Sequence, residues 1–222
     1  PRLASFRFAT GAALALVAAN ALPFAACAAD ATAAPAPAAA AAAGVVPVVA
    51  RINTAIVPVP QRLEDRLPQT AVTNFNTRHD NYVARAKQGD IDLLFVGDSI
   101  TQNWGGARGP TDWATSSAPL HDAAFGVGYD RTQHLLWRLQ NGEAAGFSPK
   151  AVVVMIGTNN IGLNTPAEIA AGVGAIVHEL RARFATAKIL LLGIFPRNAK
   201  DSRDRQLVAA TNQLIAPQHD GQ

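Results

Sequence analysis

Four short runs of apolar residues recur between about residue 90 and residue 195, and none of them alternates strictly with polar residues. A strand that is covered by helices on both faces reads as a continuous apolar run, because neither side of it meets water. The pattern therefore predicts four buried strands of a parallel sheet. They are IDLLFV (91–96), the short segment 123–127, AVVVMI (151–156) and KILLLGIF (188–195).

Segments with helical spacing separate these runs. The clearest one covers 166–184, where apolar residues recur every three or four positions. It starts with a capping box of Thr165 and Glu168, and Pro166 stands in its first turn. Alternating strands and helices predict an α/β protein with a three-layer α/β/α, flavodoxin-like fold and right-handed crossovers. The other predicted helices cover 72–87, 131–140 and 204–216.

The N-terminal part of the chain has the composition of a secretory signal. Arg2 and Arg7 precede an apolar stretch over 8–19 that is too short to span a bilayer, and small residues follow it. We therefore expect a signal peptide over 1–29 and an exported protein, either periplasmic or secreted. The only cysteine, Cys27, lies in a lipobox-like context, but the sequence favours simple cleavage over lipidation.

Residues 30–60 consist mainly of Ala, Pro and Val. Such a composition cannot supply a varied core, and its prolines interrupt helices, so it predicts a linker. The end of this stretch, 45–59, is a candidate for an added edge strand. The folded domain is then expected over 61–222.

Charge and composition exclude several classes of function. The 19 Lys and Arg residues nearly balance the 16 Asp and Glu residues, and no basic run is present, so nucleic acid is not an expected partner. The five histidines show no ligand-like spacing, so neither a metal nor a cofactor is expected. No stable membrane span is expected either.

Polar residues follow the first three predicted strands directly. They include Ser99 after the first strand, Asp130 after the second and Asn159 after the third. The carboxyl ends of parallel strands meet at one edge of the sheet, where such folds bind their ligands. A Ser between a buried strand and a helix start exposes its hydroxyl beside free N–H groups, and a nearby Asn can donate to an oxyanion. We therefore predict that Ser99 is a nucleophile and that Asn159 stabilises an oxyanion.

Three segments in this order carry a resemblance to a known family: FVGDSI (95–100), FGVGYDRTQHLLWRL (125–139) and IGTNN (156–160). They resemble blocks I to III of the SGNH (GDSL) hydrolases. The stretch 119–197 is similar to the catalytic subunits of intracellular platelet-activating-factor acetylhydrolase and their bacterial relatives. The resemblance implies a serine esterase that cleaves short acyl groups, acetyl above all, through an acyl-serine intermediate. For an exported enzyme the expected substrate is a small-molecule ester of a lipid or carbohydrate.

The resemblance also implies an oxyanion hole built from backbone N–H groups of Ser99 and of a block II glycine, together with the Asn159 side chain. In this chain Tyr129 stands in the place of that glycine, and Gly128 is one position earlier. Both are therefore candidates. The backbone N–H of Tyr129 is available, and its direction depends on whether the residue adopts a positive φ.

The family's catalytic Asp and His lie three residues apart after a fifth strand. No Asp in this chain is followed three residues later by His. We therefore expect the chain to be truncated before the fifth strand, with a nucleophile and oxyanion donors but without the other two members of a triad. The alternative is a non-catalytic SGNH-like module that binds acyl or sugar groups.

Other residues of these segments have simpler interpretations. Asp130 and His134 lie four apart, which is typical of a capping Asp and a surface His at a helix start. Arg131 replaces the third glycine of a dinucleotide-binding loop, which argues against a nucleotide cofactor. Trp104 is a candidate for contact with substrate, whereas Trp137 fits the core. Asp98 and Asn160 are expected to support their turns.

Overall fold

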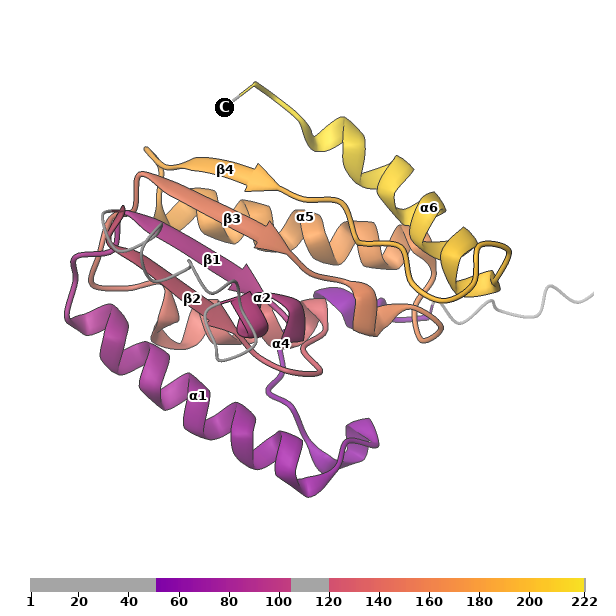
Figure 1. Ribbon diagram of the computed structural model, residues 1–222, viewed down its shortest axis with the longest axis horizontal. Coiled ribbons are helices and arrows are strands. Elements are labelled where there is room, and N and C mark those ends of the chain that lie inside the picture. Colours follow the sequence, from indigo (N-terminus) through magenta and orange to yellow (C-terminus); the bar gives the residue numbers. More distant parts are fainter. Residues whose placement is uncertain (1–50, 105–119, 222) are drawn as a thin grey trace, which may run out of the picture. The chain divides into compact units, whose positions relative to one another are not determined.

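A computed structural model describes residues 51–104 and 120–221 (Figure 1). These residues belong to one compact unit that extends from Val49 to Gln222. The predicted signal peptide over 1–29, Cys27 and residues 30–50 of the predicted linker lie outside the described residues.

The described residues form a four-stranded parallel sheet in the order β2-β1-β3-β4. This arrangement confirms the α/β fold with a parallel sheet that the apolar runs predicted. Three of the four observed strands are shorter than the predicted runs, and the second has the predicted length but begins one residue earlier. The strands are β1 (Leu93–Gly97), β2 (Asp122–Gly126), β3 (Ala151–Met155) and β4 (Lys188–Leu191).

Helices flank the sheet, and α5 contacts both α4 and α6. Figure 1 shows α5 running behind β3 and β4, and it shows α2 at the arrowhead end of β1. Fully buried residues of α5, among them Val173, Ile176 and Leu180, join those of the strands in a single core. The helices are α1 (Gln69–Lys87), α2 (Ser99–Trp104), α4 (Thr132–Arg138), α5 (Pro166–Arg183) and α6 (Arg203–Ile215).

The start of α5 has the capping box that its sequence predicted. The Thr165 side chain accepts a hydrogen bond from the Glu168 N–H, and the Glu168 carboxylate accepts one from the Thr165 N–H. Pro166 occupies the first turn, where its missing N–H costs nothing. The helix therefore begins at the residue that the sequence indicated.

The segment over 51–60 is packed on the domain, which corrects the expected linker boundary at Gln61. It contains a short 3-10 turn, η1 (Thr54–Ile56), whose Ala55 is fully buried. The Ala55 carbonyl accepts a hydrogen bond of 2.8 Å from the Thr132 hydroxyl, and the Val59 N–H donates to the Gln133 carbonyl. The edge strand considered for 45–59 is not present over 51–59, where these backbone groups bond to α4 and not to the sheet.

The helix predicted over 131–140 ends earlier than expected. α4 stops at Arg138, and a wider turn (η4, Leu139–Glu143) follows it. Gly142 adopts a φ of 110°, which breaks the helical path. The turn places the Glu143 side chain inside the protein, where it is fully buried.

Two glycines allow α2 to cross the ends of β1 and β2 at very short range. A Cβ on Gly97 would clash with the Thr101 side chain of α2, and one on Gly126 would clash with the Gln102 backbone nitrogen of the same helix. Only glycine fits at both positions. Gly97 and Gly126 therefore allow α2, the helix that starts at Ser99, to pack directly on the ends of β1 and β2.

Candidate active site

The candidate site lies where the three neighbouring strands β2, β1 and β3 end. Gly97 at the end of β1 is in register with Gly126 on one side and with Met155 on the other. The Val127 N–H continues this ladder with a hydrogen bond to the Gly97 carbonyl. Because β1 is central, the turn that carries Ser99 is flanked by the turns that carry Tyr129 and Asn159. The chain runs from β1 to one side and then to the other, and such switch points are the usual ligand sites of open α/β sheets.

Ser99 is the first residue of α2 and is partly exposed. Asp98 precedes it and is buried, and its carboxylate accepts a hydrogen bond of 2.9 Å from the Ile100 N–H. This bond fixes the strand-to-helix turn, as expected for Asp98. Two N–H groups of this first helical turn bond to Asp98, that of Ile100 to its carboxylate and that of Gln102 to its carbonyl, so neither is available to an oxyanion.

The environment of the Asp98 carboxyl group disfavours its charged form. Burial raises its pKa to about 6, the Ile100 N–H works against this rise, and the neighbouring Asp130 adds to it. The second carboxylate oxygen is buried and has no hydrogen-bond partner. A buried oxygen without a partner makes ionisation costly, and Asp98 therefore acts as a structural acceptor.

The turn after β2 distinguishes between the two candidate oxyanion donors, Gly128 and Tyr129. The Gly128 N–H donates to the Gln102 side chain at 2.9 Å, so it is already used. Tyr129 has a φ of 63°, and its N–H forms no hydrogen bond with any other described residue. Its side chain is half exposed. The geometry therefore favours the Tyr129 N–H as the donor from this turn.

Asn159 lies in the short 3-10 turn after β3 (η5, Thr158–Asn160), which Gly157 enters with a φ of 118°. Its amide nitrogen donates to the Asp130 carbonyl at 2.9 Å. An amide has two hydrogens, so one remains for another acceptor. The bond draws the Asn159 side chain toward the turn after β2, on the same side as Tyr129.

Asn160 has a different environment from its neighbour. It is fully buried, accepts a hydrogen bond from the Thr132 N–H, and donates to the side chains of Gln133 and Asn164. All its bonding capacity serves the protein interior. It supports the turn, as the sequence predicted, and cannot face a substrate.

The Asp130 and His134 pair is not a catalytic dyad, but our expectation of a capping Asp and a surface His was also wrong. Both side chains are fully buried. Asp130 is paired with Arg138, and His134 accepts a hydrogen bond of 3.2 Å from the Arg131 N–H. The other nitrogen of His134 lies 3.4 Å from the Asp65 carboxylate. Sequence spacing suggested the surface, whereas the N-terminal segment covers this face of α4.

All five histidines of the chain are described, and none forms a hydrogen bond with Ser99. His79 is the most constrained of the remaining four, because it lies 2.8 Å from the buried Glu143 carboxylate.

Trp104 ends α2 and packs edge-to-face against Phe95 at 6.0 Å, with part of its surface exposed. Contact between Trp104 and a substrate stays a prediction. Trp137 packs between Phe75 and His79, in the contact between α1 and α4.

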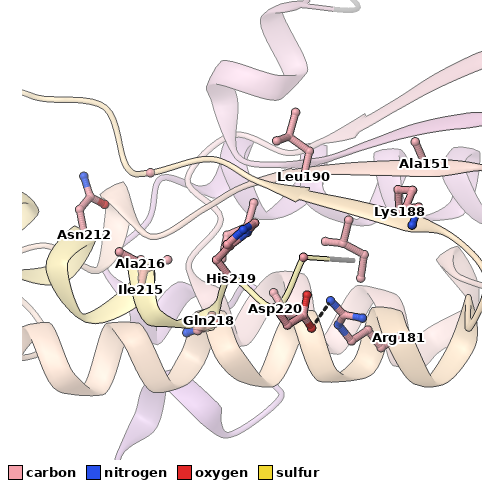
Figure 2. A pocket seen from close by; sticks show the side chains of 15 residues that line it. Ala151, Arg181, Lys188, Leu190, Asn212, Ile215, Ala216, Gln218, His219 and Asp220 are labelled. Carbon is pink, nitrogen blue, oxygen red and sulfur yellow. Dashed lines mark ion pairs between the residues drawn. The ribbon is translucent and has the colours of Figure 1, made fainter. Parts of the chain in front are cut away.

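A cavity of about 580 Å³ lies in another part of the domain, among β4, α5 and the end of α6 (Figure 2). Leu190 and Ile215 line it, and an ion pair of 2.6 Å joins Arg181 and Asp220 at its wall. None of the residues predicted for ester chemistry lines this cavity. The candidate site is therefore the open edge at Ser99 and not this cavity.

The geometry at Ser99 agrees with a comparison against known families. The GDSL-like Lipase/Acylhydrolase family model matches residues 95–219, which include all three segments of the site. The chain belongs to this family. Ser99 lies in the Gly-Asp-Ser segment (97–99) after which the family is named, and Asn159 lies in the segment after β3.

Curated relatives support the assignment to the GDSL-like family. The chain is 42% identical over 139 residues to the human platelet-activating factor acetylhydrolase IB subunit alpha2, covering 63% of this chain and 59% of that protein. It is 37% identical to the human alpha1 subunit, covering 62% of this chain and 58% of that protein. The chain thus spans about three fifths of the length of these relatives.

Solved structures include a member of the lipolytic protein G-D-S-L family from Veillonella parvula, which is 16% identical. The match covers 58% of this chain and 72% of that one, with a TM-score of 0.46.

Over 51–104 and 120–221, no helix combines the length and the hydropathy that a bilayer span needs. In the same ranges no group of three acidic, His or Cys side chains is placed to hold a metal ion.

Proposed function

We propose that this protein is a serine ester hydrolase that removes short acyl groups, acetyl above all, from a small-molecule lipid or carbohydrate ester. The observation that carries the proposal is the position of Ser99 after the central strand, between the unused Tyr129 N–H and the Asn159 side chain. A nucleophile flanked by two preorganised donors is the arrangement that acyl transfer needs.

In the proposed reaction the Ser99 hydroxyl oxygen attacks the acyl carbon while its proton passes to a His. The carbonyl oxygen becomes an oxyanion, which accepts hydrogen bonds from the N–H groups of Ser99 and Tyr129 and from Asn159. Collapse of the intermediate breaks the ester bond, and the His returns its proton to the leaving alcohol. Water then attacks the acyl-serine in the same way and releases the acid.

The proposal also needs a general base that takes the proton from Ser99. None of the five histidines forms a hydrogen bond with Ser99, and the sequence contains no Asp-x-x-His pair. In the proposed mechanism this base is a His that an Asp orients. If no such base exists, the alternative function is binding of acyl or sugar groups without turnover.

The preference for acetyl groups has two supports. The relatives are named as acetylhydrolases of platelet-activating factor. The bulky Tyr129 also stands at the oxyanion turn, where it restricts the room for a long acyl chain.

An exported enzyme, with a signal peptide over 1–29, would meet acetylated carbohydrates or lipids outside the cytoplasm. Determining the N-terminal residue of the mature protein tests export, and a mature protein that retains residues before Cys27 would refute it.

The test of activity uses the product of the complete gene and p-nitrophenyl esters of increasing acyl length. We expect hydrolysis that is fastest with acetate, and a loss of about 10³-fold or more in Ser99→Ala, because the nucleophile is gone. Ser148→Ala is the matched control, since Ser148 is exposed before the start of β3, at the opposite end of the strands from Ser99, and should not affect the rate. Equal hydrolysis by wild type and Ser99→Ala would refute the proposal, and saturable ester binding without hydrolysis would favour the binding module.

A further inference from the structure

A fully buried arginine lies beneath the turns of the candidate site. The Arg138 guanidinium donates to the Gly97 carbonyl at 3.3 Å and to the Phe125 carbonyl at 3.2 Å. Gly97 ends β1 directly before the Asp98-Ser99 turn, and Phe125 lies near the end of β2. One side chain thus bonds to the ends of both strands whose turns carry the proposed backbone donors.

Arg138 is held in place by two buried carboxylates. Its Nε atom donates to Asp130 at 2.8 Å, and its Nη1 atom forms an ion pair with Glu143. Glu143 in turn contacts His79. Burial by itself lowers the pKa of the guanidinium, but the charges of Glu143 and Asp130 outweigh it and raise the pKa overall. The arginine therefore stays protonated and keeps all its hydrogen bonds.

Asp130 connects this arginine to the donors themselves. Its carbonyl accepts the hydrogen bond from Asn159, and its N–H closes the turn onto Val127, with Tyr129 directly before it. The carboxylate of Asp130 is bonded to Arg138 on one oxygen and to Gln61 on the other. A shift of Asp130 would therefore move both Tyr129 and Asn159.

Gln61 reaches the same turn from the N-terminal segment, outside the part of the chain that the family model matches. It is buried, and its amide donates to the Asp130 carboxylate and to the Gly128 carbonyl, both at 2.8 Å. The Gly128 carbonyl belongs to the same peptide group as the Tyr129 N–H. The bond from Gln61 therefore sets the orientation of that peptide group.

We propose that Arg138 and Gln61 are positioning residues that align the three donors of the oxyanion hole, both through Asp130 and through their bonds to the Gly97, Phe125 and Gly128 carbonyls. The inference rests on the proposed esterase function. Oxyanion donors stabilise the transition state more than the bound ester, so misalignment should lower kcat and leave KM nearly unchanged. A general loss of stability would not produce this separation, as long as the measured molecules are folded.

The test measures kcat and KM for p-nitrophenyl acetate with the product of the complete gene, well below every melting temperature. Arg138→Lys keeps the charge but cannot reach both carbonyls and both carboxylates, and Gln61→Met keeps the size but loses both bonds. We expect kcat to fall about 10-fold to 100-fold in each variant, with KM within about 2-fold of wild type. Leu180→Ala is the control, because Leu180 is fully buried near the C-terminal end of α5 and bonds to none of these groups. It should lower the melting temperature and leave kcat unchanged.

Each outcome decides the inference. Values of kcat within about 2-fold of wild type in both variants would overturn it, and so would an equal loss of kcat in Leu180→Ala. If Arg138→Lys does not fold, Gln61→Met alone decides, because it removes two hydrogen bonds and no charge. A wild-type protein without activity would refute the esterase function itself, which separates that failure from a failure of this inference.

Discussion

The Asn159 side chain donates a hydrogen bond of 2.9 Å to the backbone carbonyl of Asp130. This bond fastens the turn after β3 to the turn after β2, across the end of the central strand β1 that leads to Ser99. Ser99, the proposed nucleophile, therefore lies between two turns that are bonded to each other. The resulting site is preorganised, because its donors do not have to find their positions during the reaction.

Replacing Asn159 with Ala should lower kcat by about 10²-fold to 10³-fold, because one oxyanion donor is lost. The melting temperature should change little, since Asn159 is only partly buried. Asn160→Ala is the matched control. It should instead destabilise the fold by about 1–3 kcal/mol, because buried groups lose their partners. Steady-state kinetics and thermal unfolding of the two variants check this, and an unchanged kcat in Asn159→Ala would remove it from the oxyanion hole.

Tyr129 should limit the acyl length that the enzyme accepts. It holds a positive φ of 63°, which costs a residue with a side chain about 1–2 kcal/mol. In Tyr129→Gly we expect equal or higher stability and a higher ratio of kcat/KM for butyrate over acetate esters. Arg66→Gly, at an exposed position with a φ of 60°, should relieve similar strain without changing this ratio. An unchanged ratio in Tyr129→Gly would show that the tyrosine does not restrict the acyl chain.

The buried Asp98 should make the protein less stable as the pH rises from about 4 to about 6. Its pKa is raised from 3.8 to about 6 in the folded protein, so the folded state binds a proton that the unfolded chain has already released. The stability present below pH 4 is lost as the pH rises through the folded pKa, and the loss amounts to about 3 kcal/mol.

Urea unfolding at pH 4 and pH 7 measures this effect. Asp98→Asn cannot ionise, so it should reduce the difference in unfolding free energy between the two pH values. Asp80→Asn, at an exposed position of α1, serves as the control and should leave the difference as in wild type. A pH dependence in Asp98→Asn equal to that of wild type would contradict the assignment.

The packed segment before Gln61 should contribute to the stability of the domain. A chain that starts at Gln61 loses the buried Ala55 and its bond to Thr132, together with the bond from Val59 to Gln133. At about 1 kcal/mol for each hydrogen bond, we expect it to be at least about 2 kcal/mol less stable than a chain that starts at Val49. Denaturant unfolding of the two chains measures the difference, and equal stabilities would restore the linker boundary at Gln61.

Much of this architecture could be predicted from the sequence, because it follows from periodicity and local chemistry. The apolar runs gave the four strands, and the capping box at Thr165 gave the start of α5. The turns after the first three strands had to share one edge once the sheet was parallel. The position of Ser99 and Asn159 at this edge therefore follows from the sequence pattern alone.

Contacts between distant segments could not be predicted in the same way. The burial of His134 depends on a cover provided by residues near Asp65, and no local pattern indicates that cover. Arg138 was missed as well, although a charged residue between Leu135 and Leu139 on an apolar helix face is a signal of a buried ion pair. The choice of Tyr129 over Gly128 needed the bond from Gly128 to Gln102, which joins separate turns.

The central claim is that Ser99 carries the acyl group during turnover. The most direct measurement is to mix the product of the complete gene with excess p-nitrophenyl acetate, quench with acid within the first turnovers, and map the peptides by mass spectrometry. The account predicts one added acetyl group on the peptide that contains Ser99 and none in Ser99→Ala. Hydrolysis without an acetyl group on Ser99, or an acetyl group on another residue that persists in Ser99→Ala, would contradict it.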